Sequence, residues 1–130
     1  MPSLRTLHRL AAAAGVELLI EPVPLLTRED RRSLELHSAI ASRLRDDPEW
    51  VLAKAHTNLA RMQERHPHAR HLLDEWARLL AEPVDEIVAA LDDARPRYRE
   101  LRHITPFAGV LDQRERAEVY RHFRRKEAAR

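Results

Sequence analysis

Apolar residues recur every three or four positions along most of the chain from residue 27 onward, which is the period of α-helices with one buried face. Leu36, Ile40 and Leu44 form the clearest of these stripes. Thr27 suits the N-cap of their helix, because its hydroxyl can accept from the backbone and acidic residues follow in the first turn. The pattern therefore predicts a long helix that begins after Thr27.

Prolines divide the remaining apolar stripes into separate helices. Pro48, Pro83 and Pro96 each suit the first turn of a new helix, where a missing N–H costs nothing. The short connections predict an all-α fold, a compact multi-helix bundle over residues 27–130. The side chains expected to face its core are Val51, Leu52, Ala55, Leu59, Met62, Leu72, Leu73, Trp76, Leu79, Leu80, Val84, Ile87, Val88, Leu91, Val119, Tyr120 and Phe123.

Residues 1–26 have a different pattern and are predicted to form a separate N-terminal arm. A short helix would end at Gly15, and the β-prone stretch 16–23 is closed by two prolines, which confine it to a sheet edge. The sequence offers no second strand, so this short N-terminal β-strand is expected to pair between subunits of a homodimer. The residues assigned to that dimerisation strand are Val16, Leu18, Leu19, Ile20 and Val23.

Composition excludes several functional classes. The 130 residues contain no cysteine, which excludes a disulfide scaffold and a thiolate zinc site, and only two glycines, which excludes a glycine-rich phosphate loop. The sequence has no run of about 18 apolar residues, so no transmembrane helix and a cytoplasmic location are expected. Residues 27–94 carry 10 basic and 14 acidic side chains (−4), and residues 95–130 carry 11 and 5 (+6). The net charge of +2 thus conceals a dipolar molecule.

The titratable residues do not form a recognisable catalytic or metal-binding pattern. His66, His68 and His71 are the densest histidine group, but a proline and arginines interrupt them, so a solvated corner without metal is expected. Acidic pairs are adjacent in sequence and would diverge on a helix. We therefore predict no enzyme activity and no cofactor.

His37 lies beside the first stripe and is expected to be half-buried, and Trp50, like Trp76, is expected to pack in the core.

The C-terminal helix carries a concentration of arginines that admits two interpretations. A solvated face laced by ion pairs, such as those of Arg114 and Arg121 with Glu118, is one of them. Contact with nucleic-acid phosphates is the other. The candidate phosphate contacts are Arg114, Arg116, Arg121, Arg124 and Arg125.

Two segments resemble known regulators. The segment from Pro2 to Ala11, with Ala14-Gly15-Val16-Glu17-Leu18, resembles the closing helix of a Cro/C1-type (XRE-like) helix-turn-helix domain. The region with Leu36-His37, Asp47-Pro48, Trp76 and above all the turn Pro106-Phe107-Ala108-Gly109-Val110-Leu111 resembles the C-terminal helical region of actinobacterial helix-turn-helix proteins. Such proteins are often antitoxin-like and are encoded beside an abortive-infection-type nucleotidyltransferase toxin.

This resemblance implies a non-catalytic, antitoxin-like regulatory module that binds a cognate toxin or another protein partner and self-associates. Its acidic residues would face a basic surface on the partner. The alternative is a DNA-binding transcriptional regulator or accessory that uses the basic C-terminal helix. The helix pair that reads bases in this family precedes the segment matched here, so no base-reading residues are carried over. The candidate partner contacts are Glu29, Asp30, Asp46, Asp47 and Glu49.

Overall fold

The computed structural model describes residues 26–130, and every regular element in that part of the chain is helical. The predicted all-α bundle is therefore confirmed for the described residues, whereas the predicted strand at 16–23 lies outside them. The elements are α2 (Arg28–Asp46), α3 (Pro48–Arg65), the short 3₁₀ helix η1 (Pro67–Ala69), α4 (Arg70–Leu80), α5 (Val84–Leu91), α6 (Pro96–His103) and α7 (Gln113–Ala128).

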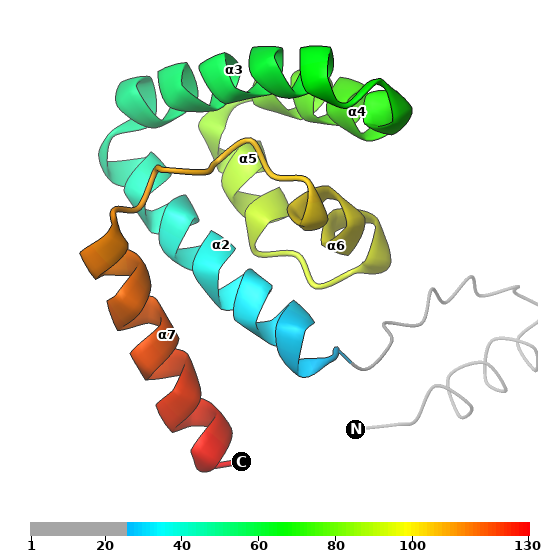
Figure 1. Cartoon of the computed structure of the whole chain (residues 1–130). Coiled ribbons are helices and arrows are strands. Elements are labelled where there is room, and N and C mark those ends of the chain that lie inside the picture. Colours follow the sequence, from blue (N-terminus) through cyan, green and yellow to red (C-terminus); the bar gives the residue numbers. More distant parts are fainter. Residues whose placement is uncertain (1–25) are drawn as a thin grey trace, which may run out of the picture.

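Helix α2 is the central element of the bundle (Figure 1). It packs most extensively against α5, and it also contacts α3, α6 and α7. Helices α3 and α4 run side by side across one end of α2, and α7 lies along its outer flank. None of the helices in the described part of the chain is long and apolar enough to cross a membrane.

Capping boxes define where the two amphipathic helices α2 and α7 begin. Thr27 Oγ1 accepts from the Asp30 backbone N–H at 3.1 Å, and the Asp30 carboxylate accepts from the Thr27 N–H at 3.3 Å. Asp112 and Glu115 form the same reciprocal pair at the start of α7. These bonds satisfy N–H groups that a helix leaves unpaired at its N-terminus. The start of α2 after Thr27 agrees with the sequence prediction.

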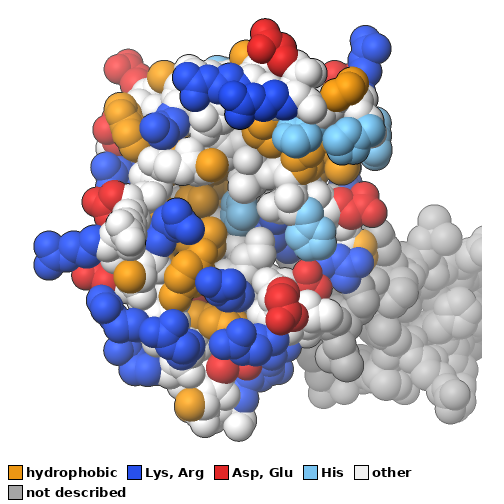
Figure 2. All heavy atoms as spheres, viewed as in Figure 1, with side chains coloured by type: hydrophobic (Ala, Val, Ile, Leu, Met, Phe, Trp, Pro, Cys, Tyr) orange, Lys and Arg blue, Asp and Glu red, His pale blue; other side chains and the backbone are white. Residues whose placement is uncertain are grey.

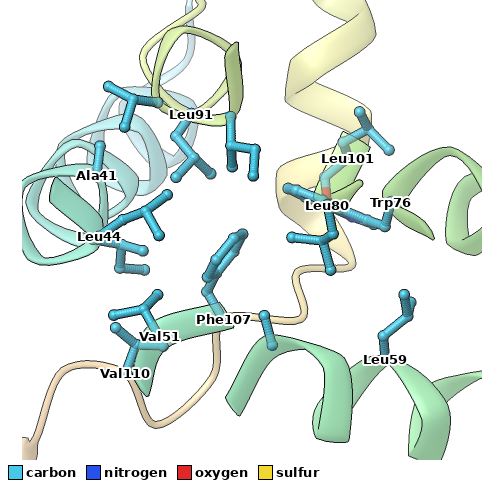
Figure 3. Packing of buried hydrophobic residues seen from close by; sticks show 14 of the residues in the cluster. Ala41, Leu44, Val51, Leu59, Trp76, Leu80, Leu91, Leu101, Phe107 and Val110 are labelled. Atoms are coloured by element: carbon cyan, nitrogen blue, oxygen red, sulfur yellow. The ribbon is translucent and has the colours of Figure 1, made fainter. Parts of the chain in front are cut away.

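The core is built around Phe107, which comes from the non-helical segment between α6 and α7 rather than from a helix (Figure 3). Its ring packs edge-to-face against Trp76 of α4, with ring centroids 5.6 Å apart. Leu44 of α2 lies on the other side of the same ring. The Trp76 indole Nε1–H donates to the Leu101 carbonyl at 3.0 Å, so its one polar atom is satisfied inside the core.

Candidate functional site

The corner between α2 and α3 combines acidic side chains with an exposed tryptophan. Asp46, Asp47 and Glu49 are all exposed there, and Trp50 leaves 42% of its surface in contact with solvent. Trp50 is the one large hydrophobic side chain among the described residues that is exposed. The prediction that it packs in the core was wrong, because Val51, Ala55 and Leu59 occupy the buried face and Trp50 lies just beside it.

Two cations hold the indole ring of Trp50 in place. The Arg43 guanidinium lies 5.5 Å from the ring centroid and the Lys54 ammonium lies 5.8 Å from it. Both distances are within the range of a cation–π attraction. Arg43 also donates to the Glu115 carboxylate at 3.0 Å, which ties the corner to the start of α7. The exposed ring therefore lies between two cations that attract it.

The turn from Pro106 to Leu111 forms the remaining wall of this corner. Asn58 of α3 donates from Nδ2 to the carbonyls of Pro106 and Ala108, both at 2.8 Å. Gly109 adopts φ +80°, a conformation that side chains oppose, and a Cβ there would lie 2.9 Å from Lys54 Cε. The most distinctive sequence motif of the chain thus lies directly against the lysine that contacts Trp50. We call Asp46, Asp47, Glu49, Trp50 and Lys54 the tryptophan corner.

The other two acidic candidates lie at the opposite end of α2 from the tryptophan corner. Glu29 is exposed, whereas Asp30 retains only 6% of its accessible surface. Its carboxylate lies 3.7 Å from Arg99 and 3.5 Å from His103. Burial raises the pKa of Asp30, but its hydrogen bonds with Thr27, together with His103 and Arg99, lower that pKa below the usual value. Asp30 therefore serves the interior of the bundle, and it is not placed to contact a partner.

The structure divides the five arginines predicted to contact phosphate into two groups. Arg114 and Arg121 share Glu118, at 3.9 and 4.0 Å, as the ion-pair interpretation expected. Arg116, Arg124 and Arg125 are exposed and have no carboxylate within 4.0 Å among the described residues. The ion-pair interpretation therefore holds for Arg114 and Arg121, and contact with phosphate stays a prediction.

The histidine group and a hollow between α2 and α7 are two further polar features of the described residues. His66, His68 and His71 are exposed, and the rings of the first two meet edge-to-face at 5.6 Å. Among residues 26–130, no group of three or more histidine or acidic side chains is placed to hold a metal ion. A hollow of about 370 Å³ between α2 and α7 is lined by three apolar residues, Leu26, Leu34 and Phe123, and by five charged ones, Arg31, Glu35, Lys126, Glu127 and Arg130. Arg31 pairs with Glu127, and Lys126 pairs with Glu35.

Trp50 is the site residue that sequence reasoning missed. Its position one residue before the stripe that begins at Val51, with three acidic residues within four positions, was the available signal. The proposed dimerisation residues, Val16, Leu18, Leu19, Ile20 and Val23, lie outside the described part of the chain.

Comparisons with known protein families, with curated proteins and with solved structures find no match to this chain.

Proposed function

We propose that this chain is a non-catalytic, antitoxin-like regulatory module that binds a protein partner through the tryptophan corner. The observation that carries the proposal is the exposed Trp50, held between Arg43 and Lys54 beside three exposed carboxylates. Tryptophan is the residue type most enriched among side chains that dominate protein–protein affinity. A ring that is already held in place loses little conformational freedom on binding.

The charge of the tryptophan corner indicates the kind of surface it would meet. Asp46, Asp47 and Glu49 would face a basic patch on the partner, and such complementarity raises the association rate and excludes acidic partners. A nucleotidyltransferase-type toxin meets this requirement, because a cleft that binds nucleotide phosphates is basic. The family resemblance of the chain points to the same partner.

The test is co-expression with the product of the neighbouring gene, followed by co-purification, calorimetry and a growth assay. We expect Trp50→Ala to weaken the complex by about 30-fold or more, as for a central hot-spot residue. Gln63→Ala is the matched control, since Gln63 is exposed on the same helix and away from the corner. Circular dichroism should show both variants folded, because neither side chain is in the core.

Either of two results would contradict the proposal. If Trp50→Ala and Gln63→Ala weaken the complex equally, the tryptophan corner is not the interface. If there is neither a complex nor a rescue of growth, the chain does not have the proposed antitoxin-like function.

Self-association through residues 16–23 is the second part of the proposal. Its support is the β-prone, proline-closed pattern of that segment. Leu19→Pro removes a backbone N–H from the proposed strand and should convert a dimer into a monomer in light scattering. Leu19→Ala is the control, because it keeps the backbone donor. A monomeric unaltered chain at high concentration would show this part to be wrong.

A further inference from the structure

A strip of exposed guanidinium groups without close ion pairs follows one side of the contact between α2 and α7. It consists of Arg28 and Arg32 of α2 and of Arg116 and Arg124 of α7, all of them exposed. None of the four has a carboxylate within 4.0 Å in the part of the chain that the structure describes. We call these four residues the arginine strip.

Aromatic rings of α7 contact the two arginines that α2 contributes to the arginine strip. The Arg32 guanidinium lies 4.0 Å from the centroid of the Tyr120 ring, and the Arg28 guanidinium lies 5.2 Å from that of Phe123. Arg116 and Arg124 lie one helical turn before and after Tyr120, so they share its face and are separated by about 12 Å along the helix. Figure 2 shows Lys and Arg side chains gathered over α7 and the adjoining part of α2, next to a band of hydrophobic atoms.

The acidic residues of α7 are already occupied by other partners. Glu115 accepts from Arg43 and caps the helix, and Glu118 lies nearest to Arg114 and Arg121. Glu127 accepts two hydrogen bonds from Arg31, at 2.6 and 3.0 Å. The positive charge of the arginine strip is therefore left for an anion outside the chain, and repeated guanidinium groups along a helix match repeated phosphates.

We propose that the arginine strip binds the phosphate backbone of duplex DNA without reading its sequence. Guanidinium groups already cover the two aromatic rings, so bases have no open ring on which to stack, which argues against single strands. The strip carries no exposed large apolar side chain that would insert into a lipid surface. The major groove of B-form DNA admits a helix, whereas that of A-form RNA is too narrow.

This DNA-binding surface is distinct from the partner-binding surface. Arg28 and Arg32 begin α2, while Asp46 and Asp47 end it, and a helix of 19 residues is about 28 Å long. At their α2 residues the two surfaces lie at opposite ends of the helix, whereas Arg116 follows Glu115 at the start of α7, where Arg43 ties that helix to the corner. The two surfaces share no residue, so variants of one can be tested against variants of the other.

The experiment is fluorescence anisotropy of the full chain with a labelled duplex of about 20 base pairs, titrated between about 50 and 200 mM salt. The test variant is Arg116→Gln with Arg124→Gln. The matched control is Arg114→Gln with Arg121→Gln, which removes the same charge from the same helix at residues that share Glu118. Glutamine is a good helix former, so both variants should keep α7 folded, which circular dichroism would verify.

We expect the unaltered chain to bind the duplex with an affinity that falls steeply with salt. The test variant should weaken binding by about 10-fold or more at 100 mM salt and reduce the magnitude of the salt slope by about 2, one for each lost phosphate contact. The control should weaken binding less than about threefold.

Several outcomes would overturn the assignment. They are absence of binding near 50 mM salt, an equal loss in the test and control variants, duplex RNA binding as tightly as duplex DNA, and binding to phosphatidylserine vesicles in place of DNA. Trp50→Ala should leave DNA binding unchanged, and its result separates this site from the tryptophan corner.

Discussion

At the scale of single residues, His37 is the clearest case of a polar group built into the core. It is 2% exposed, and both ring nitrogens are bonded, Nδ1 to the Ser33 carbonyl at 2.8 Å and Nε2 to the Thr105 hydroxyl at 2.9 Å. A carbonyl can only accept, so Nδ1 carries the proton, and Nε2 accepts from Thr105. The Thr105 oxygen in turn accepts from the Phe107 N–H at 3.2 Å. Neutral His37 thus connects α2 to the segment that carries Phe107.

The buried position of His37 predicts a loss of stability in mild acid. Burial, offset in part by the Ser33 hydrogen bond and assisted by the nearby Arg102 charge, lowers the pKa of His37 to about 4. In the unfolded chain this histidine binds its proton near pH 6.5. Between pH 6.5 and 4 the unfolded state therefore holds more protons than the folded state, and lowering the pH stabilises the unfolded state relative to the folded one. The free energy of unfolding should fall by about 3 kcal/mol from this residue as the pH drops through that window.

Urea unfolding at a series of pH values measures this effect. His37→Gln should be less stable at neutral pH, because two hydrogen bonds are perturbed, yet its stability should depend less on pH between 6.5 and 4. His56→Gln is the control, since His56 is exposed on α3. The stability of this variant should depend on pH in the same way as that of the unaltered chain. A His37→Gln profile that parallels the unaltered chain would show that His37 is not the titrating group.

At the scale of elements, the segment between α6 and α7 is fixed from outside rather than by its own hydrogen bonds. Few backbone bonds span it, and one of them joins the Val110 N–H to the Phe107 carbonyl at 3.2 Å. Asn58 supplies two further donors from α3, and Thr105 anchors the start of the segment to α2. The position of Phe107 in the core therefore depends on contacts of its segment with α2 and α3.

Asn58 provides a direct test of this anchoring. Asn58→Ala removes both donors to the Pro106 and Ala108 carbonyls, and we expect a loss of about 1–3 kcal/mol in the free energy of unfolding. Asn58→Asp should cost more, because a carboxylate of the same shape would face two carbonyl oxygens. Thr57→Ala is the control, since its exposed hydroxyl bonds only within α3, to the Ala53 carbonyl. Chemical denaturation that ranks Thr57→Ala with Asn58→Ala would contradict this role.

At the scale of the whole molecule, α2 separates two surfaces of opposite character. The tryptophan corner lies at its C-terminal end with three exposed carboxylates, and the arginine strip begins at its N-terminal end. Helix α7 joins them, because its first turn carries Arg116 and pairs with Arg43 through Glu115, and a later turn carries Arg124. The two surfaces do not follow the charge asymmetry along the sequence, because Arg28 and Arg32 belong to the acidic segment 27–94.

The sequence predicted the elements of this fold better than it predicted the site. The capping boxes at Thr27 and Asp112 and the breaks at proline follow from short-range hydrogen bonding, which a linear pattern records. The surfaces depend on which flank of each helix its neighbours cover. Trp50 and Asp30 both show this: the tryptophan expected in the core is exposed, and the aspartate assigned to a partner is buried against Arg99 and His103.

The sequence by itself determined the helical class, the positions at which helices begin, and the uneven charge, because each of these arises from neighbours within about four residues. The tertiary structure alone decided that Phe107 fills the core, that His37 is neutral and doubly bonded, and which arginines lack a carboxylate partner. These features depend on contacts between segments as far apart as α2 and α7, and helical periodicity carries no information about such contacts.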